Sequence, residues 1–239
     1  MILMDKYRFT TEIQCKNMIK CNIIAVTGSD NPKYDKRNSI IEDFLSMDKK
    51  CEIDFEISHA VKPTDFNVVD GKIIYDGESF DISQRFSHLP TSYFANYLSH
   101  YKIWKEMGPS IVLEDDVIYD IDVFNRLPSI IEKFEKIGVS NKILCLQSSC
   151  PWRDGLPDKQ YQNVIDFSED FYMLYNKVFN DVSGTAAYYM NIDQQLLLNL
   201  KREVGATDGI LDDLFKSNRL IYFIPKNFDK WFKLNREVQ

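Results

Sequence analysis

The sequence lacks the features that mark secreted, disulfide-stapled and membrane-spanning proteins. Its five cysteines are odd in number and form no C-x-x-C pair, so they indicate neither a disulfide framework nor a zinc knuckle. There is no N-x-S/T acceptor site, the opening MILMDKYRFT has no apolar signal-peptide stretch, and no apolar run approaches the roughly 20 residues that cross a bilayer. We therefore expect a cytoplasmic protein in a reducing compartment, without a transmembrane segment.

Positive charge is also scarce. The chain has 29 Lys and Arg residues against 36 Asp and Glu residues, which gives a formal net charge of −7. Because nucleic-acid binding depends on neutralising phosphates with basic side chains, this balance excludes a general nucleic-acid-binding role. An anionic substrate would need a local cation, and a bound metal ion is the simplest one.

What the chain does have is an alternation of short apolar runs with longer segments of helical periodicity, which predicts an α/β fold. Since 44% of the residues are apolar and no Gly/Ser- or Pro-rich linker interrupts them, we expect one domain over residues 1–239, with its core at about 21–225. The predicted strands, several of them apolar throughout, span residues 22–27, 51–57, 110–114, 142–147, 185–190 and 220–224. The predicted helices span residues 33–47, 92–107, 123–137, 193–202 and 208–216.

Individual residues add detail to these predicted helices and strands. Ser92 is the expected N-cap of the second helix, and Pro128 predicts a kink or restart in the third. Gly71 and Gly77 indicate a small hairpin or excursion within residues 62–90. Residues 148–184 have no regular periodicity, and a long irregular segment in a compact domain is often a substrate loop or lid.

Three acids follow the strand expected at residues 110–114. The strand runs directly into Glu114-Asp115-Asp116, at the carboxyl end where open α/β sheets bind ligands. Since residues two apart on a strand share a face, we expect Glu114 and Asp116 to point together and Asp115 to point elsewhere. Carboxylates there suit Mg²⁺ or Mn²⁺, which shares its coordination shell with substrate phosphates. Solvated acids at a strand end are the competing interpretation, which the buried strand before them disfavours.

Two motifs and their spacing resemble the family 25 glycosyltransferases, which include bacterial lipooligosaccharide galactosyltransferases and procollagen galactosyltransferases. The motifs are LSHYKIW at residues 98–104 and IVLEDDV at residues 111–117. Weaker matches follow in the family's order: Arg37 in the first helix, GTAAYYM at residues 184–190, and Thr207-Asp208 before a short helix.

The resemblance implies a GT-A architecture, a single Rossmann-like α/β domain with a mostly parallel central sheet flanked by helices. It implies Asp116 as the main ligand of Mn²⁺ or Mg²⁺, with Glu114 and Asp115 near the metal or the donor ribose. The implied activity is transfer of a hexose, with galactose or glucose favoured, from a UDP-sugar to a glycan or another hydroxyl acceptor. Because transfer in this family looks inverting, a general base is required.

Asp208 is the base that we favour, because it lies at a predicted helix start after Gly205. Asp212 and Asp213 are the fallback candidates, and the competing role of Asp208 is that of an N-cap. Thr185 and the preceding Gly184 are expected to lie beside the donor sugar, although a tight turn before a strand explains Gly184 equally well.

The remaining candidates each have a structural alternative. Arg37 is expected to pair with donor phosphate or to form an ordinary helix-surface salt bridge. His100 is expected to contact the donor or to form a hydrogen bond in the interior. Trp152 and Arg153 are candidates for acceptor binding, and the aromatic and basic tail at residues 226–233 either packs inward or makes peripheral contact with a membrane or partner.

Two other classes of function compete with this enzyme. A non-catalytic nucleotide-sugar or glycan-binding protein on the same fold would bind UDP without transferring sugar. A receiver-type signalling domain also clusters acids at strand ends near Mg²⁺, but its acid pair follows the first strand. Here the first strand is followed by Thr27-Gly28-Ser29-Asp30, which disfavours that class.

Overall fold

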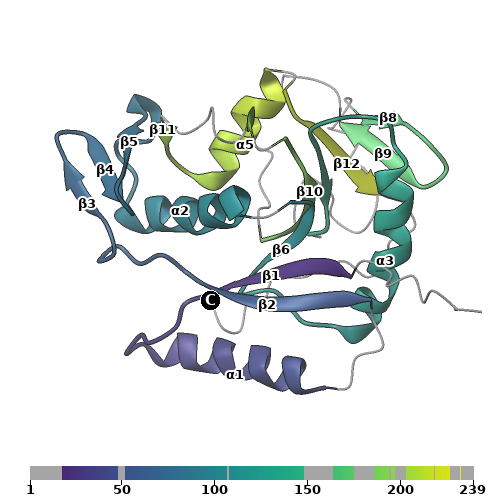
Figure 1. Ribbon diagram of the computed structural model, residues 1–239, viewed down its shortest axis with the longest axis horizontal. Coiled ribbons are helices and arrows are strands. Elements are labelled where there is room, and N and C mark those ends of the chain that lie inside the picture. The colour runs from purple at the N-terminus through teal and green to yellow at the C-terminus, as the bar shows by residue number, and fades with distance from the viewer. Residues whose placement is uncertain are drawn as a thin grey trace, which may run out of the picture.

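The computed structural model describes residues 18–47, 52–106, 108–147, 164–174, 186–193, 195–196, 203–217, 219–226 and 232. Its centre is an eight-stranded sheet (Figure 1). In spatial order the strands are β2 (Ile53–His59), β1 (Ile19–Ala25), β6 (Ser110–Glu114), β10 (Ala187–Asn191), β7 (Lys142–Cys145), β12 (Ile221–Pro225), β9 (Phe171–Leu174) and β8 (Val164–Asp166). The α/β class predicted from the sequence is confirmed.

The sheet is mixed. Strands β2, β1 and β6 pair in parallel, as do β7 and β12. Strand β10 runs antiparallel between β6 and β7, and β9 runs antiparallel between β12 and β8. All strands except β10 and β9 therefore point the same way, and their carboxyl ends lie at one edge.

Each face of the sheet is covered by its own helices. The apolar strand residues alternate between two buried clusters, so that Ile23 faces one cluster and Ile24 the other. The first cluster contains side chains of α1 (Pro32–Ser46) and α3 (Ile121–Glu135). The second contains side chains of α2 (Thr91–Glu106) and α5 (Thr207–Lys216). Burial on both faces explains why these strands are apolar throughout.

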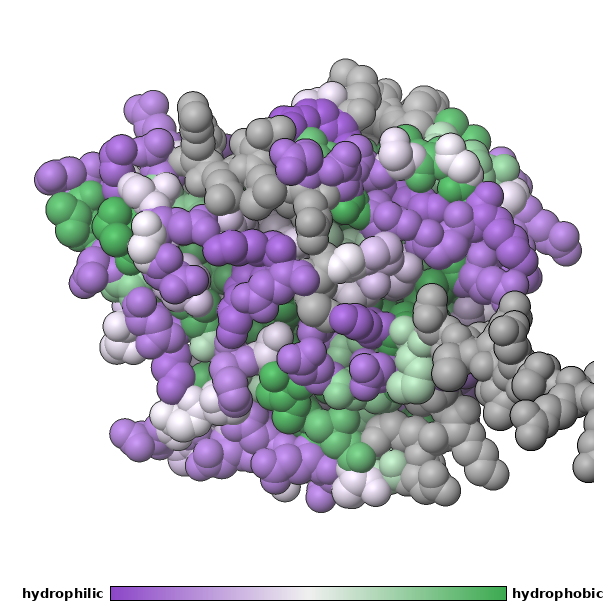
Figure 2. All heavy atoms as spheres, in the orientation of Figure 1, coloured by the Kyte–Doolittle hydropathy of each residue, from purple (hydrophilic) through white to green (hydrophobic). Residues whose placement is uncertain are grey.

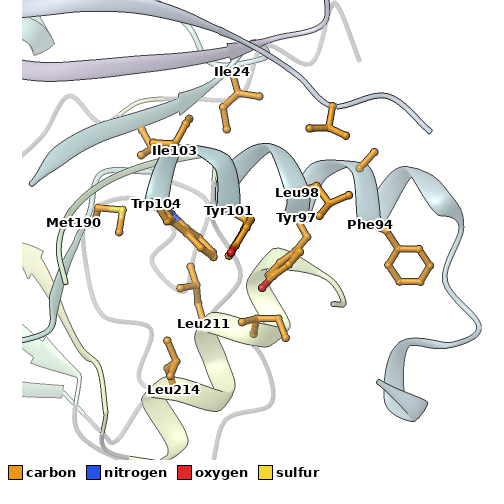
Figure 3. Close-up of a cluster of buried hydrophobic side chains, with 14 of the residues drawn as sticks. Ile24, Phe94, Tyr97, Leu98, Tyr101, Ile103, Trp104, Met190, Leu211 and Leu214 are labelled. Carbon is orange, nitrogen blue, oxygen red and sulfur yellow. The ribbon is translucent and has the colours of Figure 1, made fainter. Parts of the chain in front are cut away.

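Helix α2 lies between the sheet and α5 (Figure 3). Its aromatic side chains Tyr97 and Trp104 are fully buried, as the spacing of apolar residues in the sequence predicted. Ile24 meets the helix from the sheet side, and Leu211 meets it from α5 (Figure 3). Burying each large apolar side chain stabilises the fold by about 1.5–3 kcal/mol, so α2 is held firmly from two sides.

The excursion between β2 and α2 supplies three strands of a second, smaller sheet, and the later strand β11 completes it. The order is β11 (Glu203–Val204), β5 (Glu78–Ile82), β4 (Lys72–Tyr75) and β3 (Asn67–Val69). Both hairpin turns are Asp-Gly pairs with positive φ, 50° and 73° at Asp70-Gly71 and 48° and 73° at Asp76-Gly77. Such pairs suit two-residue turns whose twist matches the flanking strands. The hairpin predicted here is therefore confirmed, and Figure 2 shows apolar side chains at its outer edge, where Val68 and Val69 are exposed.

The structure differs from the sequence predictions in three places. Helix α2 begins at Thr91, so Ser92 lies inside the first turn and is not the N-cap. Helix α3 continues through Pro128 without the restart that was one of the two expectations, and Leu127, Ile131 and Phe134 on either side of the proline are buried in one cluster. The region expected to be irregular contains the β8–β9 hairpin.

Among the described helices, none combines the length and the apolar character that a membrane span needs.

Candidate active site

The acidic triplet begins at the last residue of β6, near the middle of the large sheet. Strand β6 is buried between β1 and β10 up to Leu113. The chain then turns, and Asp115 and Asp116 lie in that turn. The triplet therefore lies at the carboxyl end of a central strand, as the sequence predicted.

Asp115 is held by a buried arginine. The Nη1 of Arg37, on α1, donates to Asp115 Oδ1 at 2.5 Å, and the backbone N–H of Val26 donates to Oδ2 at 3.3 Å. Arg37 is only 7% exposed, because α1 begins soon after β1 with Asn31 as its N-cap and Pro32 at its first position. Burial raises the pKa of Asp115 above its usual value, although the Arg37 charge and both hydrogen bonds act in the opposite direction.

The orientation of the three acids differs from the strand alternation expected above. Asp116 Oδ2 lies 3.7 Å from Arg37 Nη2, so Asp115 and Asp116 share one guanidinium. Glu114 instead points toward α2. The reason is that the strand ends at Glu114, so the alternation of faces does not extend to the two residues in the turn.

Glu114 is fixed by two side chains of α2. His100 Nε2 lies 3.0 Å from Glu114 Oε1, and Asn96 Nδ2 donates to the same oxygen at 3.1 Å. Behind the histidine, the Tyr188 hydroxyl lies 2.8 Å from His100 Nδ1 and accepts from Trp104 Nε1 at 2.8 Å. An ionised carboxylate only accepts, so Nε2 carries the hydrogen and, in a neutral ring, Nδ1 accepts from the tyrosine.

The motif at residues 98–104 thus has a structural explanation. Leu98 is part of the buried cluster between the sheet and α5. Ser99 donates to the Ala95 carbonyl and accepts from the backbone N–H of Val61, both at 2.8 Å, which ties α2 to the chain after β2. His100 is fully buried and orients Glu114 through the hydrogen bond from its Nε2. Its interior role, one of the two expected from the sequence, is what the geometry shows.

A pocket of about 510 Å³ lies beside these groups, between the chain after β1, the chain after β2, and α2. It is lined by apolar, small polar and charged residues: Ile24, Val26, Gly28, Ser29, Tyr34, Arg37, Ala60, Val61, Lys62, Pro63, Thr64, Ser92, Ala95, Asn96, Ser99, Glu114 and Asp115. Two of the lining residues are joined to each other, because Lys62 Nζ donates to the Gly28 carbonyl at 3.3 Å. The pocket therefore brings two of the three acids together with two basic side chains.

Sequence reasoning missed Lys62, Tyr34 and Asn96. Lys62 and Tyr34 follow the carboxyl ends of β2 and β1, the edge where ligands bind in such sheets, and this position was the available signal. Asn96 precedes His100 by one helical turn, so it lies on the same face of α2. The position of Asn96 one turn before His100 was therefore the available signal.

Several predicted residues fall outside what the structure describes. They are Thr185, Gly184, Trp152 and Arg153, together with the side chains of Asp208 and Asp212. Asp208 is the second residue of α5, because the helix begins at Thr207, one residue before the predicted start. The preceding Thr207 donates its hydroxyl to Asn96 Oδ1 at 2.5 Å, which places the start of α5 next to a pocket-lining residue.

The carboxylates of the triplet are the residues that could hold a metal ion. In the part of the chain with described side chains, no three His, Cys, Asp or Glu residues are clustered as metal ligands. Mg²⁺ and related ions are, however, usually held by one or two carboxylates, with water and substrate phosphates completing the shell. The side chains of Glu114 and Asp116 are 22% and 17% exposed, and of the two only Glu114 lines the pocket. The triplet therefore has oxygen ligands of the type that such an ion prefers.

Comparison with known proteins identifies the family. A family model described as glycosyltransferase family 25 (LPS biosynthesis protein) matches residues 31–209. The chain belongs to glycosyltransferase family 25. The matched region includes Arg37, α2, the acidic triplet and the first turn of α5. No curated protein matches the chain.

Membership of family 25 makes the protein a glycosyltransferase, an enzyme that moves a sugar from a donor to an acceptor. It confirms the family resemblance seen in the two sequence motifs. It also removes the receiver-type signalling domain from consideration.

Proposed function

We propose that this family 25 glycosyltransferase transfers a hexose, with galactose or glucose favoured, from a UDP-sugar to a glycan or another hydroxyl-bearing acceptor. The observation that carries the proposal is that one pocket, at the carboxyl ends of β1, β2 and β6, is lined by Glu114, Asp115, Arg37 and Lys62. Its volume of about 510 Å³ lies within the range of about 300–1,000 Å³ typical of small-molecule sites.

The charges in the pocket favour a metal-assisted donor site. The two basic and two acidic side chains that line it cancel formally, so a nucleoside diphosphate needs further positive charge to bind there. We propose Mn²⁺ or Mg²⁺ held by Asp116 and Glu114; when bound, such an ion stabilises negative charge on a leaving diphosphate. Lys62 lines the same pocket, where its ammonium would bind phosphate oxygens.

The other roles follow from the positions of the chain's own groups. Arg37 keeps Asp115 in place and, through it, the turn that carries Asp116. His100 and Asn96 keep Glu114 turned toward the pocket. We propose a GT-A architecture and inverting transfer, in which Asp208, or Asp212 one turn later, takes the acceptor proton as general base; the position of α5 beside the pocket supports this.

A cytoplasmic location remains our proposal. Its support is the cysteine pattern of the sequence, which is odd in number and has no C-x-x-C pair, as suits a reducing compartment.

Calorimetric titration with UDP, with and without Mn²⁺, tests the donor site. We expect metal-dependent binding that Asp116→Ala weakens at least about tenfold, the effect of losing about 1.4 kcal/mol. Asp54→Ala, which removes an exposed acid of β2 outside the pocket lining, is the matched control and should bind as the parent does. A folded protein that binds no UDP with or without the metal would refute the UDP site.

Turnover separates the enzyme from a non-catalytic binding protein. UDP-sugars are then screened for hydrolysis and for transfer, with the parent and with Asp208→Asn. Transfer that Asp208→Asn abolishes while UDP affinity stays unchanged supports the general base. Binding without hydrolysis or transfer, and a silent Asp208→Asn, would indicate the binding protein.

A further inference from the structure

The Asn96 side chain bridges two elements that are far apart in the sequence. Its Nδ2 donates to Glu114 Oε1 at 3.1 Å, and its Oδ1 accepts from the Thr207 hydroxyl at 2.5 Å, across 111 residues of chain. Glu114 ends β6 and Thr207 begins α5. One amide on α2 therefore connects the acidic triplet to the start of α5.

The chemistry of the partners fixes the direction of both hydrogen bonds. An ionised Glu114 only accepts, so the amide nitrogen must face it. The amide oxygen then faces Thr207, whose hydroxyl must donate. Asn96 is half-buried and Thr207 is 2% exposed, so water does not readily replace the second bond.

The opposite side of the same helix start is held by the excursion. Strand β11 pairs with β5 just before α5 begins. A Cβ built on Gly205 would lie 2.1 Å from the Phe86 ring, and one on Gly209 would lie 2.4 Å from it. The Phe86 ring thus packs directly against both glycines. The first turn of α5 is therefore seated between this ring on one side and Asn96 on the other.

We propose that Asn96 and Thr207 are positioning residues that set the start of α5 relative to the acidic triplet. The proposal rests on the proposed function, in which α5 carries the general base Asp208 next to Thr207. Loss of the Asn96–Thr207 bond leaves the donor groups in place and lets the helix start move. Because misplacement by about 1 Å costs up to about 100-fold in rate, the effect falls on kcat.

Two substitutions of Thr207 make the kinetic test. Thr207→Val removes the hydroxyl with little change in shape, whereas Thr207→Ser keeps it. We expect Thr207→Val to lower kcat about 10- to 100-fold with UDP affinity within about twofold of the parent, and Thr207→Ser to restore kcat to within about threefold. Equal kcat in the parent and Thr207→Val, or an equal loss in both variants, would overturn the proposal.

Hydrogen exchange of the segment at residues 203–211 gives a readout that needs no activity. We expect about tenfold faster exchange in Thr207→Val and in Asn96→Ala, no change in Thr207→Ser, and no further increase in the double variant, because both changes remove the same bond. Unchanged exchange in both single variants, or additive increases in the double variant, would overturn the coupling. A parent that transfers no sugar would refute the proposed function, and the exchange pattern would still decide whether Asn96 holds α5.

Discussion

Arg37 and Asp115 lie 78 residues apart in the sequence and form a 2.5 Å hydrogen bond in the interior. The bond joins α1 to the turn after β6. Because Asp116 shares the same guanidinium, one arginine orients two acids of the triplet. The helix-surface salt bridge expected for Arg37 is wrong, because the side chain is buried, whereas its pairing with donor phosphate stays a prediction.

Arg37→Met should strongly destabilise the protein, because it leaves a buried carboxylate without its cation. Removing one partner of a buried ion pair costs about 3–5 kcal/mol, and we expect a free energy of unfolding lower by about that amount. Urea denaturation in EDTA measures it. Lys36→Met, at an exposed position of the same helix, is the control and should change stability by less than about 0.5 kcal/mol. Equal midpoints for the two variants would contradict a structural role for Arg37.

The loss in free energy of unfolding that Arg37→Met causes should depend on pH. Burial raises the pKa of Asp115 in the folded state, so the folded protein holds this proton more tightly than the unfolded chain, and this contribution to stability is lost as pH rises through the folded-state pKa. The positive charge of Arg37 and its hydrogen bond lower this pKa, so the pKa of Asp115 should be higher still in Arg37→Met. The stability gap between parent and variant should therefore widen as pH rises through the folded-state pKa of Asp115 in the parent, which lies above the usual value, and narrow as pH falls below it. Denaturation curves from pH 3 to about 7 would show the trend, and a gap independent of pH would exclude Asp115 as its origin.

Gly209→Ala should destabilise the protein, although glycine to alanine within a helix usually stabilises by about 0.5–1 kcal/mol. The new Cβ would lie 2.4 Å from the Phe86 ring, and overpacking of this kind costs about 1–3 kcal/mol. Thermal denaturation measures the loss. Combining the change with Phe86→Ala removes the overlap, so the double variant should be less destabilised than the sum of the single ones. Gly138→Ala, with no atom within 4 Å of the new Cβ, is the control.

His100→Leu should weaken metal-dependent UDP binding, because the histidine holds Glu114 toward the pocket. We expect a loss of about tenfold in affinity, equivalent to one hydrogen bond to a charged group. Tyr188→Phe removes the hydroxyl behind His100 and keeps the bond to Glu114, so its effect on affinity should be smaller. Calorimetry on both variants makes the comparison. Equal losses would show that His100 acts through the general stability of the core.

Much of the fold could be predicted because its signals are local. The strand predicted at residues 110–114 coincides with β6, and the aromatic spacing of α2 identified its buried face. The Asp-Gly pairs indicated the small hairpin for a stereochemical reason, since aspartate and glycine accept positive φ readily. The β8–β9 hairpin was missed, because its strands are short and lie in a region without clear periodicity.

The site was less predictable, because its contacts join distant parts of the chain. The triplet and its place at a strand end followed from the sequence, whereas the burial of Arg37 depends on how α1 packs against the sheet. Strand alternation failed for Asp116, because β6 ends before it. The bridge formed by Asn96 has no local signature at all, since both of its partners are set by tertiary packing.

The place of β10 in the sheet has a consequence for synthesis on the ribosome. Strands β2, β1 and β6 are neighbours and are complete once residue 114 has been added. Strand β7 comes next in the sheet's parallel set, yet its two neighbours are β10 and β12, which are made later. Its hydrogen-bonding edges therefore stay unpaired until at least residue 191 has left the exit tunnel. Translation slowed within this interval would prolong the exposure of an apolar strand, and this is the stage at which we expect the nascent chain to depend most on chaperones.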